Sequence, residues 1–211
     1  MTRLLDMGVE RLRNIVLDMA KHSEAAVSTA IDAYREGKDV TEKIFKWSEE
    51  LRILQDEASE LAVELIARYQ PVASDLRFIK SCMEIAYGFS RFGRYAYDIS
   101  QVLHTFGDLS SCDKEAIELA DKQAREMIRL SIRAFIERDQ NLASKLREMD
   151  DVVDKIYSDF IQKVVQASNI EIKCVLSVTL ILRYLERIAD HATYIGESVS
   201  YIITGERAIR R

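Results

Sequence analysis

The stretch Arg183–Glu197 reads RYLERIADHATYIGE. It holds Glu186 and Asp190 four residues apart, and Glu197 follows two turns later. On a helix of about 3.6 residues per turn, the three carboxylates fall within roughly 40° of one another. The rest of that stripe is apolar or threonine: Ile172, Val175, Thr179, Leu182 and Thr193. We therefore expect a long helix with acids on its core side. Those acids must be paired or bound to metal, because burying a bare carboxylate is costly.

The composition indicates a helical protein. The chain has 211 residues, of which 48% are hydrophobic and 31% charged, so a packed core is expected in one large or two small domains. Seven glycines and one proline are too few for a sheet fold with many turns. The net charge of −5 argues against a nucleic-acid-binding protein. The basic C-terminal end is interpreted as a solvated tail: Arg207, Arg210 and Arg211.

The cysteines and the apolar runs predict a cytoplasmic location. Cys82, Cys112 and Cys174 are odd in number and far apart, so we expect three reduced thiols that pack as small core residues. The N-terminal residues lack the apolar segment of a signal peptide. The longest mostly apolar run, Cys174–Leu182, is shorter than the ~20 residues needed to span a bilayer, so no membrane span is predicted.

Helical spacing of apolar residues and the turn residues divide the chain into six helices. The expected ranges are 4–36, 40–69, 74–104, 113–137, 140–166 and, after a turn at 168–169, a helix that ends near 203. Ser74 or Asp75 is expected to cap the third helix. Three segments recur in the same order in the second half, which indicates an internal duplication. The predicted fold is all-α, with two tandem antiparallel three-helix bundles at 1–108 and 109–211.

The fifth helix carries a second acid pair, Asp150 and Asp154, while Asp151 points about 100° away. The pair lies in an apparent core stripe: Ala143, Leu146, Val153, Tyr157, Ile161 and Val164. Four converging carboxylates need a cation between them or raised pKa values, and such a site favours hard metals. The alternative is a partly exposed rim of the bundle, where each acid pairs with Arg183, Arg187 or a lysine of a neighbouring helix. His191 points about 100° away from its neighbour Asp190, so it either flanks the site or lies against another helix.

Two segments resemble the PhoU family of phosphate-uptake regulators. Arg68–Arg77 reads RYQPVASDLR and Leu185–Ala192 reads LERIADHA, and the similarity covers about residues 25–206. The resemblance implies a cytoplasmic, non-catalytic protein of two three-helix bundles that binds metal ions through E/D-x-x-x-D motifs and restrains phosphate uptake. It also implies a homodimer, whose partners are a phosphate ABC transporter and, in many bacteria, a phosphate-sensing histidine kinase.

Carried over by position, the expected metal ligands are Asp150, Asp154, Glu186 and Asp190, with Asp151 and Glu197 as weaker candidates. The metal is left open among Fe, Mg, Mn, Zn and Ca. The first bundle departs from the family pattern, because the corresponding acids are replaced by Ser48, Arg52, Ser90 and Arg94. We therefore expect no metal there. Arg52 and Arg94 either bind an anion such as phosphate or pair with Glu49 and Asp98.

Two other classes of protein remain as alternatives. The first is a helical scaffold or partner-binding protein without metal, with its acids in ion pairs. The second is a di-iron carboxylate protein, which needs Glu-x-x-His on two helices. Here Ala189 stands three residues after Glu186, so the second alternative is the weaker.

Overall fold

The computed structural model describes residues 4–168 and 171–206. These residues form six helices: α1 (Leu4–Glu36), α2 (Thr41–Tyr69), α3 (Ala73–Phe106), α4 (Glu115–Glu137), α5 (Gln140–Gln166) and α6 (Ile172–Thr204). The all-α prediction is confirmed. No helix in the described ranges has an apolar stretch that could cross a membrane. The C-terminal arginines and part of the turn expected at 168–169 lie outside the described residues.

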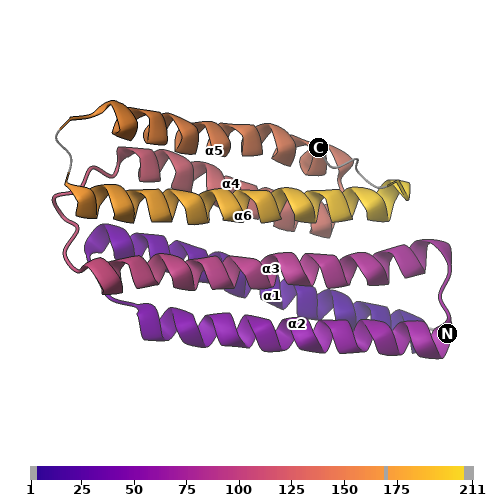
Figure 1. Cartoon of the computed structure of the whole chain (residues 1–211). Helices are drawn as coiled ribbons and strands as arrows, with labels where there is room; N and C mark the ends of the chain where they lie inside the picture. The colour runs from indigo at the N-terminus through magenta and orange to yellow at the C-terminus, as the bar shows by residue number, and fades with distance from the viewer. Residues whose placement is uncertain (1–3, 169–170, 207–211) are drawn as a thin grey trace.

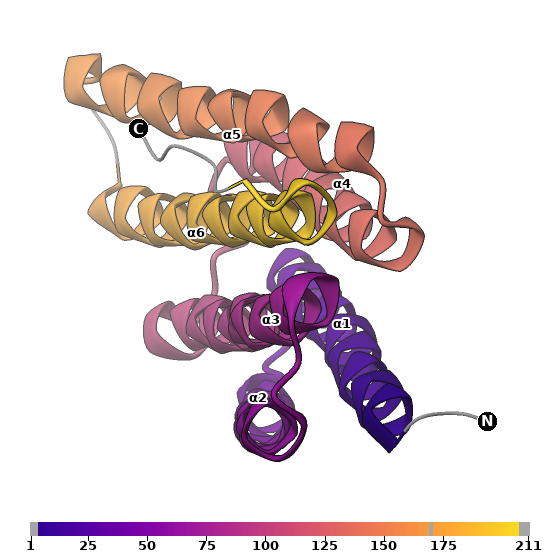
Figure 2. The same ribbon diagram turned by 90° about the vertical axis from the view of Figure 1, so that its right-hand side faces the viewer.

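The helices form two three-helix bundles, α1–α3 and α4–α6 (Figure 1). The bundles meet where α3 and α6 run side by side in opposite directions, and α1 also contacts α4 (Figure 2). The division expected at 108/109 falls in the linker between α3 and α4, residues 107–114. Helix α6 therefore contacts α5 inside its own bundle and α3 of the other bundle, and this α3–α6 contact is called the seam below.

Most helix ends lie where turn chemistry predicts. Gln70 takes a left-handed conformation with φ 46° and, with Pro71, ends α2. The Asp139 carboxylate accepts hydrogen bonds from two backbone amides and so caps α5. The cap predicted for α3 is wrong, because the helix already begins at Ala73 and Val72 makes no side-chain cap bond. Asp75 instead lies in the first turn, where its negative charge interacts favourably with the positive end of the helix dipole.

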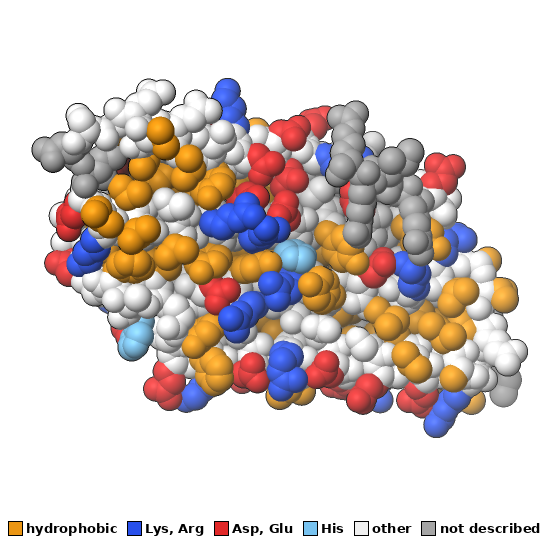
Figure 3. Space-filling model, viewed as in Figure 1, with side chains coloured by type: hydrophobic (Ala, Val, Ile, Leu, Met, Phe, Trp, Pro, Cys, Tyr) orange, Lys and Arg blue, Asp and Glu red, His pale blue; other side chains and the backbone are white. Residues whose placement is uncertain are grey.

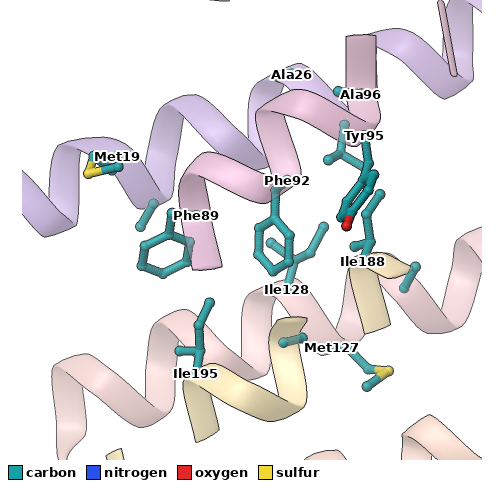
Figure 4. Packing of buried hydrophobic residues seen from close by; sticks show 14 of the residues in the cluster. Met19, Ala26, Phe89, Phe92, Tyr95, Ala96, Met127, Ile128, Ile188 and Ile195 are labelled. Carbon is teal, nitrogen blue, oxygen red and sulfur yellow. The ribbon is translucent and has the colours of Figure 1, made fainter. Parts of the chain in front are cut away.

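One hydrophobic core runs through both bundles. Phe89 and Phe92 of α3 are fully buried and lie between Met19 of α1 and the side chains of the second bundle, among them Ile128 and Ile195 (Figure 4). Apolar burial is the main stabilising term in folding, so this shared core fixes the two bundles against each other. The seam therefore belongs to the interior of the molecule.

The cysteine prediction is correct for Cys82, which is fully buried and free, and wrong for the other two. Cys112 of the 107–114 linker forms a disulfide with Cys174 in the first turn of α6. Their Cα atoms are 5.2 Å apart, within the range a disulfide requires. The sequence hid this pair because 62 residues separate its members, and only the folded linker brings them together.

Candidate metal site

The predicted ligands lie where α5 and α6 cross closely. A Cβ added at Gly196 would stand 3.0 Å from the Ala143 carbonyl oxygen and 2.7 Å from a methyl of Leu146. The glycine thus permits the close approach of the two backbones. Since α5 and α6 are antiparallel, Asp150 lies near the level of Asp190, and Asp154 near that of Glu186. The fold brings the four predicted acids together along the line where α5 meets α6; this acid-lined strip of the surface is called the groove below.

The groove is a surface feature, which corrects the predicted core stripe. On α5 only Ala143, Leu146 and Val153 are buried, whereas Asp154 is exposed. On α6 the stripe begins at Ile172, whose side chain is 75% exposed. Figure 3 shows Asp and Glu side chains gathered over α5 and α6, with Lys and Arg side chains beside them.

The carboxyl groups destabilise each other's charge. Burial raises the pKa of Asp150 to about 7, and the negative charges of Asp190, Asp154, Asp151 and Glu186 add to the effect. Burial and then the Asp190 charge raise the pKa of Glu186. Burial also raises the pKa of Asp190. Acids that repel one another in this way favour a cation between them.

Two arginines of α6 partly neutralise the cluster. Arg183 Nη1 donates to Glu186 Oε1 at 2.6 Å. Arg187 Nη1 donates to Asp190 Oδ2 at 3.4 Å, and its Nε lies 3.9 Å from Glu186 Oε2. The rim of ion pairs that the sequence left as an alternative is therefore present for these two acids.

The donor set nevertheless fits a hard metal ion. Asp150 Oδ1 and Glu186 Oε2 are buried and have no hydrogen-bond partner among the described residues. Buried carboxylate oxygens without partners are costly, and carboxylates are the preferred ligands of hard cations. In the present side-chain positions, no three acidic, histidine or cysteine side chains within residues 4–168 and 171–206 are placed to hold one ion. Binding a metal at this groove thus requires the acids to rotate toward each other.

The weaker candidates lie apart from the four acids. Glu197 pairs with Arg147 of α5 at 3.0 Å, an ion pair that the sequence did not reveal. Asp151 is exposed and acts on Asp150 only through its charge.

His191 lies against another helix, one of its two predicted positions. Its ring contacts Tyr87 and Tyr95 of α3, with centroids 5.6 and 5.7 Å away. Burial, followed by the charges of Arg91 and Arg187, lowers the pKa of His191 to about 4. The imidazole is thus neutral at physiological pH and packs in the seam. Arg91 and Tyr95 are four residues apart on α3 and are hydrogen-bonded at 2.8 Å, as their spacing allows, but nothing in that spacing indicates that His191 of α6 packs against them.

The arginines of the first bundle pair with acids of their own helices. Arg52 contacts Glu49 at 3.2 Å and Asp56 at 3.1 Å, and Arg94 contacts Asp98 at 3.3 Å. These contacts match the ion-pair alternative given above. The anion-binding hypothesis for Arg52 and Arg94 stays a prediction.

The comparisons with known proteins agree with the duplicated fold. Residues 16–103 and 117–199 each match the PhoU domain. A phosphate-specific transport system accessory protein PhoU homolog of Synechocystis sp. is 30% identical over 207 residues, 96% of this chain and 92% of the relative. Homolog 1 of Methanothermobacter thermautotrophicus is 28% identical over 94% of both chains. The crystal structure of PhoU from Pseudomonas aeruginosa has a TM-score of 0.87 at 26% identity and covers 95% of this chain and 99% of that chain. Because the family model matches both bundles, this chain belongs to the PhoU family.

Proposed function

We propose that this protein is an accessory regulator of a phosphate-specific transport system that acts through protein–protein contacts. The observation that carries the proposal is the nearly full-length similarity to phosphate-specific transport accessory proteins of distant organisms. The partners are a phosphate ABC transporter, a phosphate-sensing histidine kinase, or both. The protein performs no catalysis in this role and works as a homodimer in the cytoplasm.

The regulatory role is tested by phosphate uptake. Cells that lack the gene should take up labelled phosphate faster than wild type when phosphate is plentiful, because a restraint on the transporter is gone. Expression of the wild-type chain should restore the slow rate. Unchanged uptake in the deletion strain would refute the role. Light scattering of the purified protein tests the homodimer.

We further propose that Asp150, Asp154, Glu186 and Asp190 bind a hard divalent or iron ion. Support comes from the carboxyl groups with raised pKa values and from the two buried oxygens that have no hydrogen-bond partner in the described part of the chain. The metal would neutralise the repulsion among the four acids, and they would hold it between α5 and α6. The ion would act as a structural cross-link between the two helices.

Metal content is measured on protein purified without chelator or histidine tag. Wild type should hold a fixed ratio of one metal, and the double variant Glu186→Gln, Asp190→Asn should hold little. A matched control is Glu60→Gln, Glu64→Gln, which removes an exposed acid pair of the same spacing from α2. The ion pairs of Arg183 and Arg187 favour a second candidate, a metal-free scaffold. Wild type that stays metal-free after incubation with Mg, Mn, Zn and ferrous iron would support that candidate.

The disulfide bears on the proposed cytoplasmic location. Glutathione and thioredoxin keep cytosolic thiols reduced, so a Cys112–Cys174 bond is unusual there. Alkylation of thiols in intact cells before lysis measures the state of the pair. The proposed cytoplasmic location requires the bond of this structure to be reduced in the cell, so that both cysteines are modified. A pair that is protected from alkylation until reductant is added would contradict the location.

A further inference from the structure

The arginines that partly neutralise the acid cluster pair with the two carboxylates of α6 that a metal between α5 and α6 needs. Arg183 and Arg187 each precede by three residues the acid that they contact, Glu186 and Asp190. Both contacts are within α6, so they form without any movement of α5. Each arginine is partly exposed, with 39% and 45% of its side chain accessible, and has solvent into which it can turn.

The acids of the two helices differ in their partners. Glu186 Oε1 and Asp190 Oδ2 of α6 each accept a hydrogen bond from an arginine. On the α5 side, Asp150 Oδ1 is buried and has no hydrogen-bond partner within residues 4–168 and 171–206. Glu186 Oε2 has no hydrogen-bond partner among the described residues, but it lies 3.9 Å from Arg187 Nε. A cation held between the helices must therefore use carboxylates of α6 that already form ion pairs with guanidinium groups. Metal binding at this groove is an exchange of one cation for another.

We propose that Arg183 and Arg187 are built-in competitors of the metal, which hold Glu186 and Asp190 in the metal-free protein and leave them when a divalent ion joins α5 to α6. This inference rests on the metal site proposed above and names its regulation. The competition weakens metal binding, because each ion pair must break before the carboxylate turns to the ion. In return, two of the four acids, Glu186 and Asp190, have their charge compensated in the metal-free protein.

The structure gives Arg183 another favourable contact. Its guanidinium lies 5.9 Å from the centre of the Tyr157 ring of α5, a contact that does not depend on Glu186. Release from the acids leaves both guanidinium groups available to anionic groups in the surroundings. Metal occupancy thereby changes which charges this face presents to a partner.

The test is a calorimetric titration of tag-free, chelator-treated protein with Mn²⁺. Arg183→Gln and Arg187→Gln should each bind Mn²⁺ roughly fivefold more tightly than wild type, since an ion pair of about 1 kcal/mol no longer has to break. The double variant should show a larger gain than either single variant. Circular dichroism on heating confirms that each variant is folded.

The matched control is Arg91→Gln, which removes one positive charge from the neighbouring seam. Arg91 acts on His191 together with Arg187, yet it donates to Tyr95 and forms no ion pair with a carboxylate of the described residues. The Mn²⁺ affinity of the Arg91→Gln variant should stay within twofold of that of wild type. An equal gain for Arg91→Gln would overturn direct competition, because loss of any nearby charge would then suffice.

The remaining outcomes separate this inference from the proposed metal site. Wild type that binds Mn²⁺ with the same or higher affinity than the arginine variants overturns the competition and leaves the site intact. Binding by the double variant but not by wild type supports both. Failure of wild type and all variants to bind Mn²⁺, Mg²⁺, Zn²⁺ or ferrous iron at millimolar concentration overturns the metal site and the competition together.

Discussion

At the scale of single residues, Asp150 is the carboxyl group of the groove that its surroundings perturb most clearly. It is half-buried, one of its oxygens has no hydrogen-bond partner among the described residues, and four other acids act on it. The nearest arginines instead contact Glu186 and Asp190. In the metal-free protein Asp150 is thus the acid with the least compensation.

Asp150→Asn should stabilise the metal-free protein above pH 7. The pKa of Asp150 is about 7 in the folded state, against an ordinary value of 3.8, so the folded state holds an extra proton between these values. The free energy of unfolding therefore falls as pH rises from about 4 to 7, and the variant lacks this loss. Partial exposure limits the gain to about 1 kcal/mol. Urea unfolding at pH 5 and pH 8 with chelator checks it.

Asp151→Asn is the control for this prediction, because Asp151 is the exposed neighbour and acts only at a distance. The difference in the free energy of unfolding between pH 5 and pH 8 should change far less in Asp151→Asn than in Asp150→Asn. A variant of Asp150 with the same pH dependence as wild type would show that Asp150 ionises at its ordinary pKa in the folded protein.

At the scale of helices, the α5–α6 crossing decides whether the acids can share an ion. Gly196 lies against the Ala143 carbonyl and the Leu146 side chain, and Thr193 donates to the Leu146 carbonyl at 3.4 Å. Both contacts lie on the α6 segment that carries Asp190. The small residue in α6 thus sets the separation of the two rows of carboxylates.

Gly196→Val should destabilise the protein by about 2 kcal/mol and weaken metal binding, because the added side chain pushes α5 away from α6. Urea unfolding and the Mn²⁺ titration measure the two effects. Ser144→Val puts the same side chain at an exposed position of α5 and should cost less than about 0.5 kcal/mol. Equal stability of the two variants would mean that the crossing tolerates a wider separation.

At the scale of the whole molecule, a buried ion-pair network joins the bundles on the side of α1 and α4. Asp121 of α4 is 2% exposed and accepts from Arg35 of α1 at 2.6 Å and from Arg125 at 2.7 Å. Arg125 also contacts Asp32 of α1 at 2.6 Å. Together with the shared core at the α3–α6 seam, these contacts hold the two halves in one arrangement.

Asp121→Asn should lower the free energy of unfolding by about 3 kcal/mol, because it leaves two partly buried guanidinium groups without their carboxylate. Asp32→Asn removes a half-exposed partner of the same arginines and should cost less than about 1 kcal/mol. Thermal unfolding of both variants checks the difference. Similar losses of stability in the two variants would mean that the half-exposed Asp32 contributes as much to the network as the buried Asp121.

The Cys112–Cys174 disulfide closes a loop of 62 residues that contains α4 and α5. Reduction should lower the free energy of unfolding by about 4 kcal/mol, mainly because the unfolded chain regains freedom. Urea unfolding with and without reductant measures this loss. The double variant Cys112→Ser, Cys174→Ser should lose similar stability and should no longer respond to reductant. A response to reductant in that variant would point to Cys82 instead.

The sequence by itself determined the six helices, the duplication and the residues that form the acid groove. These follow from local rules: apolar spacing, turn residues such as Pro71, and acids four residues apart on one helix face. The acid pairs Asp150 with Asp154 and Glu186 with Asp190 also indicated that the helices now labelled α5 and α6 carry the site.

Only the tertiary structure decided which side of each stripe is covered and which groups touch. Helical spacing shows that Asp154 shares a face with Asp150, but not that Asp154 is exposed while Asp150 is partly buried. The Cys112–Cys174 and Arg35–Asp121 contacts join residues 62 and 86 positions apart. Such contacts depend on how whole helices pack, and side-chain spacing along one helix carries no information about its neighbours.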